Sequence, residues 1–265
     1  MSPLPTVILR VLTAVTARVL TAITAVVAAA PLGSATPLGA TTAPVSAMLA
    51  PDCAVAPAMS IADVPWPQQR YDLDALSQIT DGTGIIVAVV DSGVDAIHPQ
   101  LRGRVLAGAD LLAPAGDGRL DCVGHGTAVA SIIGAGRRPG AGLRGLAPGV
   151  KILPVRVSER LEVDGAATGR GVDAAGLADG IDRAVAGGAR VVNLSISVGV
   201  DDPQLRRSVA QAQAADVVVV AAVGNQHEQG DPTPYPAAYP GVVGVGAIGP
   251  DGNRTATSPI GSYVD

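Results

Sequence analysis

The chain has 265 residues, of which 48% are hydrophobic, so it can bury the core of one large domain or two small ones and is not a disordered protein. Its 18 Lys and Arg residues against 23 Asp and Glu residues give a net charge of −5 and leave no basic patch, so we expect no nucleic-acid partner. Aromatic residues make up 2% and Phe is absent, so the core must consist of Val, Ile, Leu and Ala, which suits buried parallel strands.

The N-terminal region resembles a secretory signal. After Arg18, an apolar run from Val19 to Ala30 ends in small residues; it is about a dozen residues long, short of the ~20 that a transmembrane helix needs. Cleavage is expected at 28–30 or at 33–35. A core helix is the alternative, which the interrupting Thr and Arg residues disfavour. We therefore expect residues 1–35 to be a signal peptide and the protein to be exported.

The two cysteines, Cys53 and Cys122, occur in a chain that we expect to meet an oxidising compartment. A disulfide between them is the expected state, and two buried free thiols are the alternative. The bridge would close a loop of roughly 69 residues and contribute on the order of 4 kcal/mol in the chain-entropy model. Because Cys122 lies just before His125, the bridge would tie the N-terminal segment to the region of that histidine.

Residues 36–79 are expected to form an extension that lies on a domain rather than a domain of their own. Much of this stretch is rich in Pro, Ala, Thr and Ser without periodicity. The sequence Pro65-Trp66-Pro67 carries the only Trp, which we interpret as an anchor onto the domain surface. A short helix is predicted from Tyr71 to Ile79, and the domain proper follows as residues 80–265.

Runs of β-branched residues alternate with helical patterns across this domain. Strands are predicted at 85–90, 150–157, 191–195, 217–223 and 242–248, and helices at 128–135, 172–186 and 203–215. Strands that alternate with helices of this length indicate a parallel sheet with right-handed crossovers. We therefore predict one α/β domain with a doubly wound, mainly parallel sheet, and surface loops at 136–145 and 159–171.

Three polar side chains stand where functional groups collect in such a sheet. Asp91 and Asn225 each follow a buried run, and His125 lies between two glycines at the mouth of an apolar helix. Taken singly, they can be a turn cap, a turn amide and a hydrogen-bonded structural histidine. Together they supply three of the four groups that acyl transfer needs. These are a carboxylate that orients an imidazole, an imidazole that acts as general base and an amide that binds an oxyanion. The fourth part is a nucleophile.

These residues lie in blocks that resemble the Asp, His and oxyanion-Asn blocks of the subtilisin family of serine proteases. The blocks are Val87–Asp95 with His98-Pro99, Gly124–Ala130 and Ala221–Asn225, with catalytic positions 34 and 100 residues apart. Within that family the sequence is similar to the mycosins, membrane-associated proteases of actinobacterial type VII secretion systems. The segments that carry this similarity are Val64-Pro65-Trp66, Gly108–Leu112, Asp121–His125 and Ile152–Arg156.

The resemblance implies roles for individual residues. Asp91 and His125 would be catalytic and Asn225 would donate to the oxyanion. The family's strand that pairs with extended substrate would be Asn193, Leu194, Ser195 and Ile196, so that Ser195 is not the nucleophile. His98 would be structural. In mycosins the extension wraps the domain and a disulfide pins it, which agrees with a pairing of Cys53 with Cys122.

The implied activity is that of a serine endopeptidase acting on protein or peptide substrate at the cell envelope, on the extracytoplasmic face of the plasma membrane. A type VII secretion membrane complex is the implied partner. We expect no cofactor and no metal ligand set, and no phosphate-cradling glycine motif supports a small-molecule binder.

The sequence departs from the family at the nucleophile, because it contains no Gly-Thr-Ser-x-Ala-x-Pro block. Ser258 precedes a proline without the glycine and the helix, and Ser262 lies in a segment that resembles the strand before that block. We likewise expect this chain to lack the C-terminal membrane helix that the resemblance to mycosins implies. We therefore expect an incomplete domain, inactive as it stands, from a truncated or wrongly predicted reading frame.

A pseudoenzyme fragment that serves as a non-catalytic structural or interaction subunit of a secretion complex is the alternative, and an unrelated α/β binding protein is a third. A Gly-Thr-Ser block further along the reading frame would restore the protease, and a true stop codon would favour the scaffold. The helix that carries the family nucleophile packs against the sheet, so we also expect an uncovered apolar surface and poor solubility.

Overall fold

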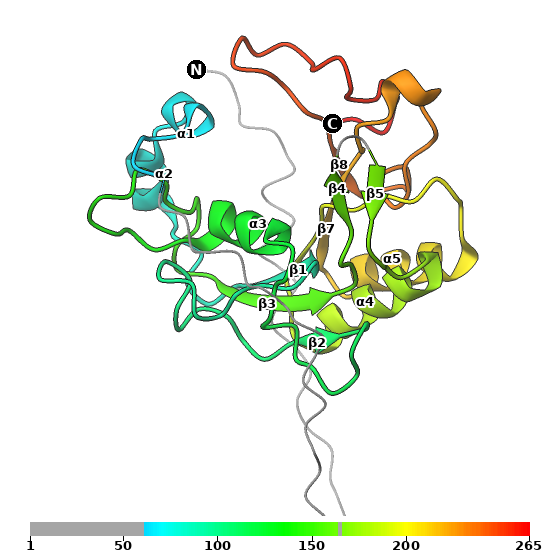
Figure 1. The fold of residues 1–265 in the computed structure, drawn as a ribbon, viewed down its shortest axis with the longest axis horizontal. Helices are drawn as coiled ribbons and strands as arrows, with labels where there is room; N and C mark the ends of the chain where they lie inside the picture. The colour runs from blue at the N-terminus through cyan, green and yellow to red at the C-terminus, as the bar shows by residue number, and fades with distance from the viewer. Residues whose placement is uncertain (1–60, 164–165) are drawn as a thin grey trace, which may run out of the picture. The chain divides into compact units, whose positions relative to one another are not determined.

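The computed structural model describes residues 61–163 and 166–265. Its centre is a six-stranded sheet in the order β2-β3-β1-β6-β7-β8, in which all neighbours are parallel (Figure 1). In that order the strands span Ala109–Asp110, Lys151–Arg156, Ile86–Asp91, Val191–Leu194, Val218–Ala222 and Val243–Val245. A separate antiparallel hairpin is formed by β4 (Leu161–Val163) and β5 (Ala166–Thr168). Because the six strands are parallel, their carboxyl ends lie at one edge of the sheet.

Strand β1 lies inside the sheet and is buried on both faces. Ala88 pairs with Leu153 of β3 on one side and with Val192 of β6 on the other. The side chains from Val87 to Val90 are at most 7% exposed. A strand in this position must be apolar throughout, so the first polar residue, Asp91, falls where the strand ends.

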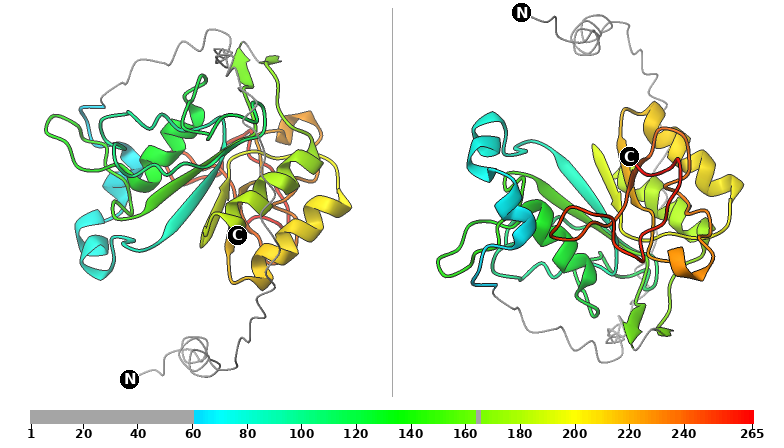
Figure 2. Two further views of the ribbon diagram at one scale, coloured as in Figure 1. Left: turned by 90° about the horizontal axis from the view of Figure 1, so that it is seen from below. Right: turned by 90° about the horizontal axis from the view of Figure 1, so that it is seen from above.

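Helices cover both faces of the sheet. Helices α4 (Ala174–Ala186) and α5 (Pro203–Ala214) lie on one face, and α3 (His125–Gly134) lies on the other (Figure 2). The carboxylates of Asp173 and Asp202 cap the first turns of α4 and α5.

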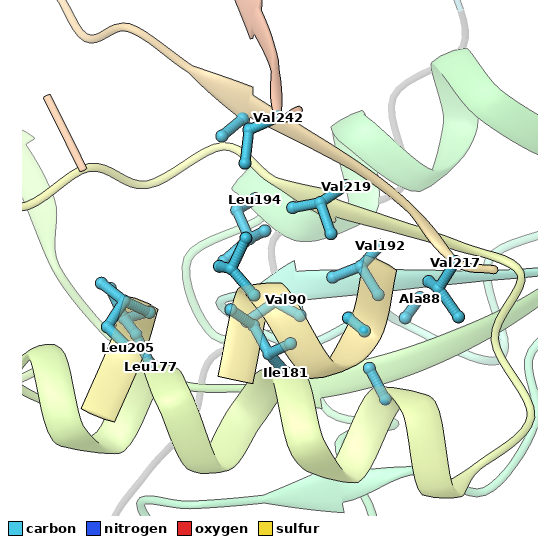
Figure 3. Close-up of a cluster of buried hydrophobic side chains, with 14 of the residues drawn as sticks. Ala88, Val90, Leu177, Ile181, Val192, Leu194, Leu205, Val217, Val219 and Val242 are labelled. Atoms are coloured by element: carbon cyan, nitrogen blue, oxygen red, sulfur yellow. The ribbon is translucent and has the colours of Figure 1, made fainter. Parts of the chain in front are cut away.

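The larger hydrophobic cluster lies between the sheet and helices α4 and α5 (Figure 3). It is built from small and branched aliphatic side chains, among them Ala88, Val90, Val192, Leu194 and Val219 from strands and Leu177, Ile181 and Leu205 from helices. A smaller cluster joins β1 and β3 to α3 through Val87, Val89, Ile152 and Ala130. The smaller cluster fixes the helix that begins at His125 against the strand that ends at Asp91.

The α3 side of β7 and β8 has apolar residues that no helix of the described chain covers. Val218, Val243 and Val245 are 51%, 40% and 49% exposed, whereas Val219 and Ala221, which face α5, are buried. These three valines form an uncovered apolar surface of the kind that the sequence predicts. Among the described residues no helix is long and apolar enough to cross a membrane.

The predicted α/β architecture is confirmed, and each predicted strand and helix has a counterpart, with α2 at Leu73–Ile79. The prediction for residues 159–171 was wrong, because the hairpin of β4 and β5 lies within this stretch. Two short strands that pair only with each other need no long apolar run. The polar composition of residues 159–171 as a whole therefore gave no sign of them. The prolines around Trp66 mark the first turn of a short helix, α1 (Trp66–Arg70).

The helix predicted from residue 128 begins three residues earlier, at His125, and is not buried all round, since Ile132 is 53% exposed. The expected signal peptide, Cys53 and most of the expected extension lie outside the described residues. The signal and the pairing of Cys53 with Cys122 therefore stay predictions.

Candidate active site

The structure brings together Asp91, the last residue of β1, and His125, the first residue of α3. His125 Nδ1 lies 2.7 Å from Asp91 Oδ1. The Asp91 side chain is 2% exposed and the His125 side chain is 54% exposed, so one edge of the imidazole is held and the other is open to solvent. A carboxylate can only accept, so Nδ1 donates this hydrogen bond, and Nε2 of the neutral ring carries a free lone pair.

Glycines on both sides of His125 make this approach possible. Gly124 has φ of +88°, a left-handed conformation that disfavours a side chain. A Cβ on Gly126 would lie 2.1 Å from the carbonyl oxygen of Gly93 and 3.2 Å from Asp91 Cβ. Helix α3 can therefore pack directly on the turn that follows Asp91 only because position 126 has no side chain.

The surroundings raise the pKa of His125 above its ordinary value. The hydrogen bond to Asp91 is the main cause, burial acts in the opposite direction, and the charges of Asp91 and Asp121 raise the pKa further. The site therefore stabilises the imidazolium, which is the form that a histidine reaches when it accepts a proton as a general base.

A third acidic residue, Asp121, lies beside the pair and is 1% exposed. Its Oδ1 accepts from the Ser92 hydroxyl at 2.9 Å and from the backbone N–H groups of Val123 and Gly124 at 3.0 and 2.8 Å. Its Oδ2 accepts from the backbone N–H and the hydroxyl of Thr127 at 2.9 and 2.6 Å. Asp121 had no predicted role of its own; its place in the block that ends at His125 was the available signal.

Two further bonds close this network onto the turn after β1. The Ser92 hydroxyl, besides donating to Asp121, accepts from the backbone N–H of Gly126 at 2.9 Å. The Thr127 hydroxyl accepts from the backbone N–H of Asp95 at 2.9 Å. The first turn of α3 is thus bonded at two points to the segment that begins with Asp91.

Asn225 lies past the carboxyl end of β7, after Gly224 with φ of +83°. Strand β6 separates β7 from β1, so Asn225 and Asp91 share one edge of the sheet. The Asn225 side chain is exposed and, within the described residues, makes no hydrogen bond to Asp91 or His125.

The predicted substrate-binding residues divide into two groups. Asn193 and Leu194 belong to β6 and pair with β1 on one side and β7 on the other, so their backbone groups are used by the sheet. Ser195 and Ile196 lie beyond the end of β6, and the Asn193 amide donates to the Ser195 hydroxyl at 3.0 Å. Strand addition requires unpaired backbone, so it is open to Ser195 and Ile196 alone among these four.

No hydroxyl group of the described residues forms a hydrogen bond with His125. Ser258 is 1% exposed and its hydroxyl accepts from the backbone N–H of Ala247 at 3.0 Å. His98 Nδ1 is buried without a partner in the described part of the chain, and burial lowers the pKa of His98. Residues 61–163 and 166–265 contain no cluster of three or more side chains suited to a metal ion.

The fold and the Asp–His pair define a known class of protein. The family model described as the subtilase family matches residues 82–265, and the chain belongs to this family. Among curated relatives, it is 36% identical over 200 residues to the thermophilic serine proteinase of Bacillus sp. (strain AK1), covering 75% of this chain and 47% of that protein. It is also 36% identical over 201 residues to thermitase of Thermoactinomyces vulgaris, covering 74% and 67%.

Solved structures of mycosins share the fold. The serine protease MycP1, described as an essential component of the type VII (ESX-1) secretion system, superposes with a TM-score of 0.65 at 30% identity, covering 79% of this chain and 66% of that chain. Against several curated relatives the chain spans about half of their length, as for subtilisin E of Bacillus subtilis (strain 168), where 51% is covered.

Proposed function

We propose that this chain carries the acid–base half of a serine endopeptidase site, with Asp91 and His125 as catalytic residues and Asn225 as the side-chain donor to the oxyanion. The observation that carries the proposal is the 2.7 Å contact between a buried carboxylate and a half-exposed imidazole at the carboxyl edge of the sheet. Membership of the subtilase family supports the same reaction class.

In the proposed reaction, His125 Nε2 accepts the proton of an attacking hydroxyl and later returns it to the leaving amine. Asp91 keeps the other proton on Nδ1 and stabilises the imidazolium, in agreement with the direction of the His125 pKa shift. The Asn225 amide donates to the oxyanion of the tetrahedral intermediate. Its side chain is exposed and, within residues 61–163 and 166–265, makes no hydrogen bond to Asp91 or His125, which is compatible with a donor that finds its partner only when substrate is present.

The proposed substrate is an extended segment of protein chain. Its backbone pairs with Ser195 and Ile196, whose main chain continues past the sheet. By likeness to MycP1, the protein works at the cell envelope with a type VII secretion system. Export through residues 1–35, an extension at 36–79 that wraps the peptidase domain at 80–265, and a disulfide between Cys53 and Cys122 belong to the same proposal.

The nucleophile has no candidate in this proposal. The sequence has no Gly-Thr-Ser-x-Ala-x-Pro block, and no described hydroxyl is bonded to His125. We therefore expect the 265-residue chain to be inactive as it stands. A non-catalytic structural or interaction subunit of a secretion complex is the alternative function.

A fluorophosphonate probe tests the missing nucleophile, because it reacts with a serine hydroxyl that a neighbouring base activates. The purified full chain should not be labelled under conditions in which thermitase is labelled. Specific labelling that the substitution His125→Ala abolishes would contradict the proposal and would reveal a serine activated by this site.

A further inference from the structure

We infer that Asp121 is a positioning residue of the Asp91–His125 pair, acting through Ser92 and through the first turn of α3. This inference rests on the proposed function for its biological meaning, but the geometry that carries it is independent of proteolysis. Asp121 makes no hydrogen bond to the imidazole within the described residues; it holds both of the segments that bring Asp91 and His125 together.

Many donors converge on this one carboxylate. Five hydrogen bonds of 2.6 to 3.0 Å reach the two oxygens of Asp121, three from backbone N–H groups and two from hydroxyls. No cation pairs with it in the described part of the chain. A carboxylate that is buried in this way replaces water with fixed donors, so it locks the positions of the groups that donate to it.

The donors lie on both sides of the Asp91–His125 contact. Val123 and Gly124 immediately precede His125, Thr127 follows it by two residues, and Ser92 follows Asp91 directly. Ser92 also links back to α3, because its hydroxyl accepts from Gly126 N–H while its own N–H donates to Asp91 Oδ1 at 2.7 Å. Asp121 is thereby joined to both members of the pair through a single side chain.

The charge of Asp121 acts on His125 as well. The charged groups around His125 are Asp91 at the end of β1 and Asp121 in the loop before α3. Arg156, which lies opposite Asp91 on β3, is engaged in ion pairs with Asp110 and Glu159. Both carboxylates raise the pKa of His125, so removing either charge has the same sign of effect.

The experiment is an NMR titration of the histidine ring signals in the full chain, which has three histidines. In Asp121→Asn the pKa of His125 should fall below its wild-type value. Asp95→Asn is the control, because Asp95 is an acidic residue bonded through its backbone to α3 that acts on His98, although it is only half-buried whereas Asp121 is buried. It should lower the pKa of His98 and leave that of His125 unchanged.

A second variant decides the question if Asp121→Asn does not fold. Ser92→Ala keeps the charge of Asp121 but removes the hydroxyl that links it to Gly126. Amide hydrogen exchange at Gly126 should become faster, and the pKa of His125 should fall because its bond to Asp91 is held less firmly. A folded variant, at either position, whose His125 pKa equals that of the wild type would overturn the inference. Neither outcome depends on whether the chain cleaves peptides.

Discussion

Two histidines of this chain contact an aspartate through Nδ1, and they do so in different ways. His125 and Asp91 come from a helix and a strand 34 residues apart and meet at 2.7 Å, with an aspartate side chain that is 2% exposed. His227, in the short helix η2 (His227–Gln229), meets Asp231 at 3.2 Å, and both side chains are partly exposed, at 32% and 26%.

The two pairs differ in the support that the rest of the fold gives them, and this support distinguishes a candidate catalytic pair from a local contact. The members of the His227 pair are four residues apart in one short turn, and the pair is bonded to a distant segment through His227 N–H, which donates to the Thr257 carbonyl, and through Ile260 N–H, which donates to Asp231. The His125 pair exists only because β1 ends and α3 begins at the same edge of the sheet, and because Asp121 and Ser92 bond the two segments. A base that must keep one orientation through a reaction needs this kind of support from outside its own turn.

The largest expected effect comes from Asp91→Asn. The substitution removes the main cause of the raised His125 pKa, so this pKa should fall in an NMR titration, and by more than in Asp121→Asn. Asp231→Asn is the control for the other pair and should leave the His125 pKa unchanged. An equal response of His125 to both substitutions would remove the distinction between the two pairs.

A smaller effect is expected in the pH dependence of stability. Because the folded state raises the pKa of His125, its pair with Asp91 contributes stability that is fully present below the ordinary value of 6.5 and is lost as pH rises through the folded-state pKa. Urea unfolding should therefore show that His125→Gln costs more free energy in mildly acidic than in mildly alkaline buffer. A difference that grows with pH would contradict the assigned direction.

The smallest effect is expected from His227→Gln. A partly exposed local pair contributes little, so the free energy of unfolding should change by less than about 0.5 kcal/mol at any pH in the same range. The His125 pKa should not respond. A loss as large as that of His125→Gln in acid would mean that the His227 pair is also structurally supported.

The sequence was sufficient for the parts of the molecule that depend on local pattern. β-Branched runs located β1, β3, β6, β7 and β8, which belong to the central sheet. The position of Asp91 after such a run predicted that it would lie at the carboxyl edge. The sequence also placed His125 between two glycines at the start of a helix, and the second of them, Gly126, makes a close approach to Gly93. Each of these follows from a few neighbouring residues and a general rule of sheet geometry.

The support of the pair could not be predicted in the same way. Asp121 acts through backbone N–H groups and through Ser92, which is 29 residues away in sequence. Backbone donors and a single distant serine leave no pattern of side chains in the sequence from which this role could be predicted. The hairpin of β4 and β5 was missed for a related reason, since strands of three residues within a stretch of polar composition are too short to show a periodic pattern. Substrate pairing at Asn193 and Leu194 likewise became untenable only when β6 proved to have neighbours on both sides.

The central claim is that His125 is held as a general base, with Nδ1–H donating a hydrogen bond to Asp91 and Nε2 free to accept a proton. Nitrogen-15 NMR of the full chain at a pH above the His125 pKa tests this directly, because it distinguishes the two tautomers of the neutral ring. We predict that Nδ1 carries the proton and Nε2 does not. A neutral His125 protonated on Nε2 would contradict this claim, since such a ring cannot accept a proton from an attacking hydroxyl.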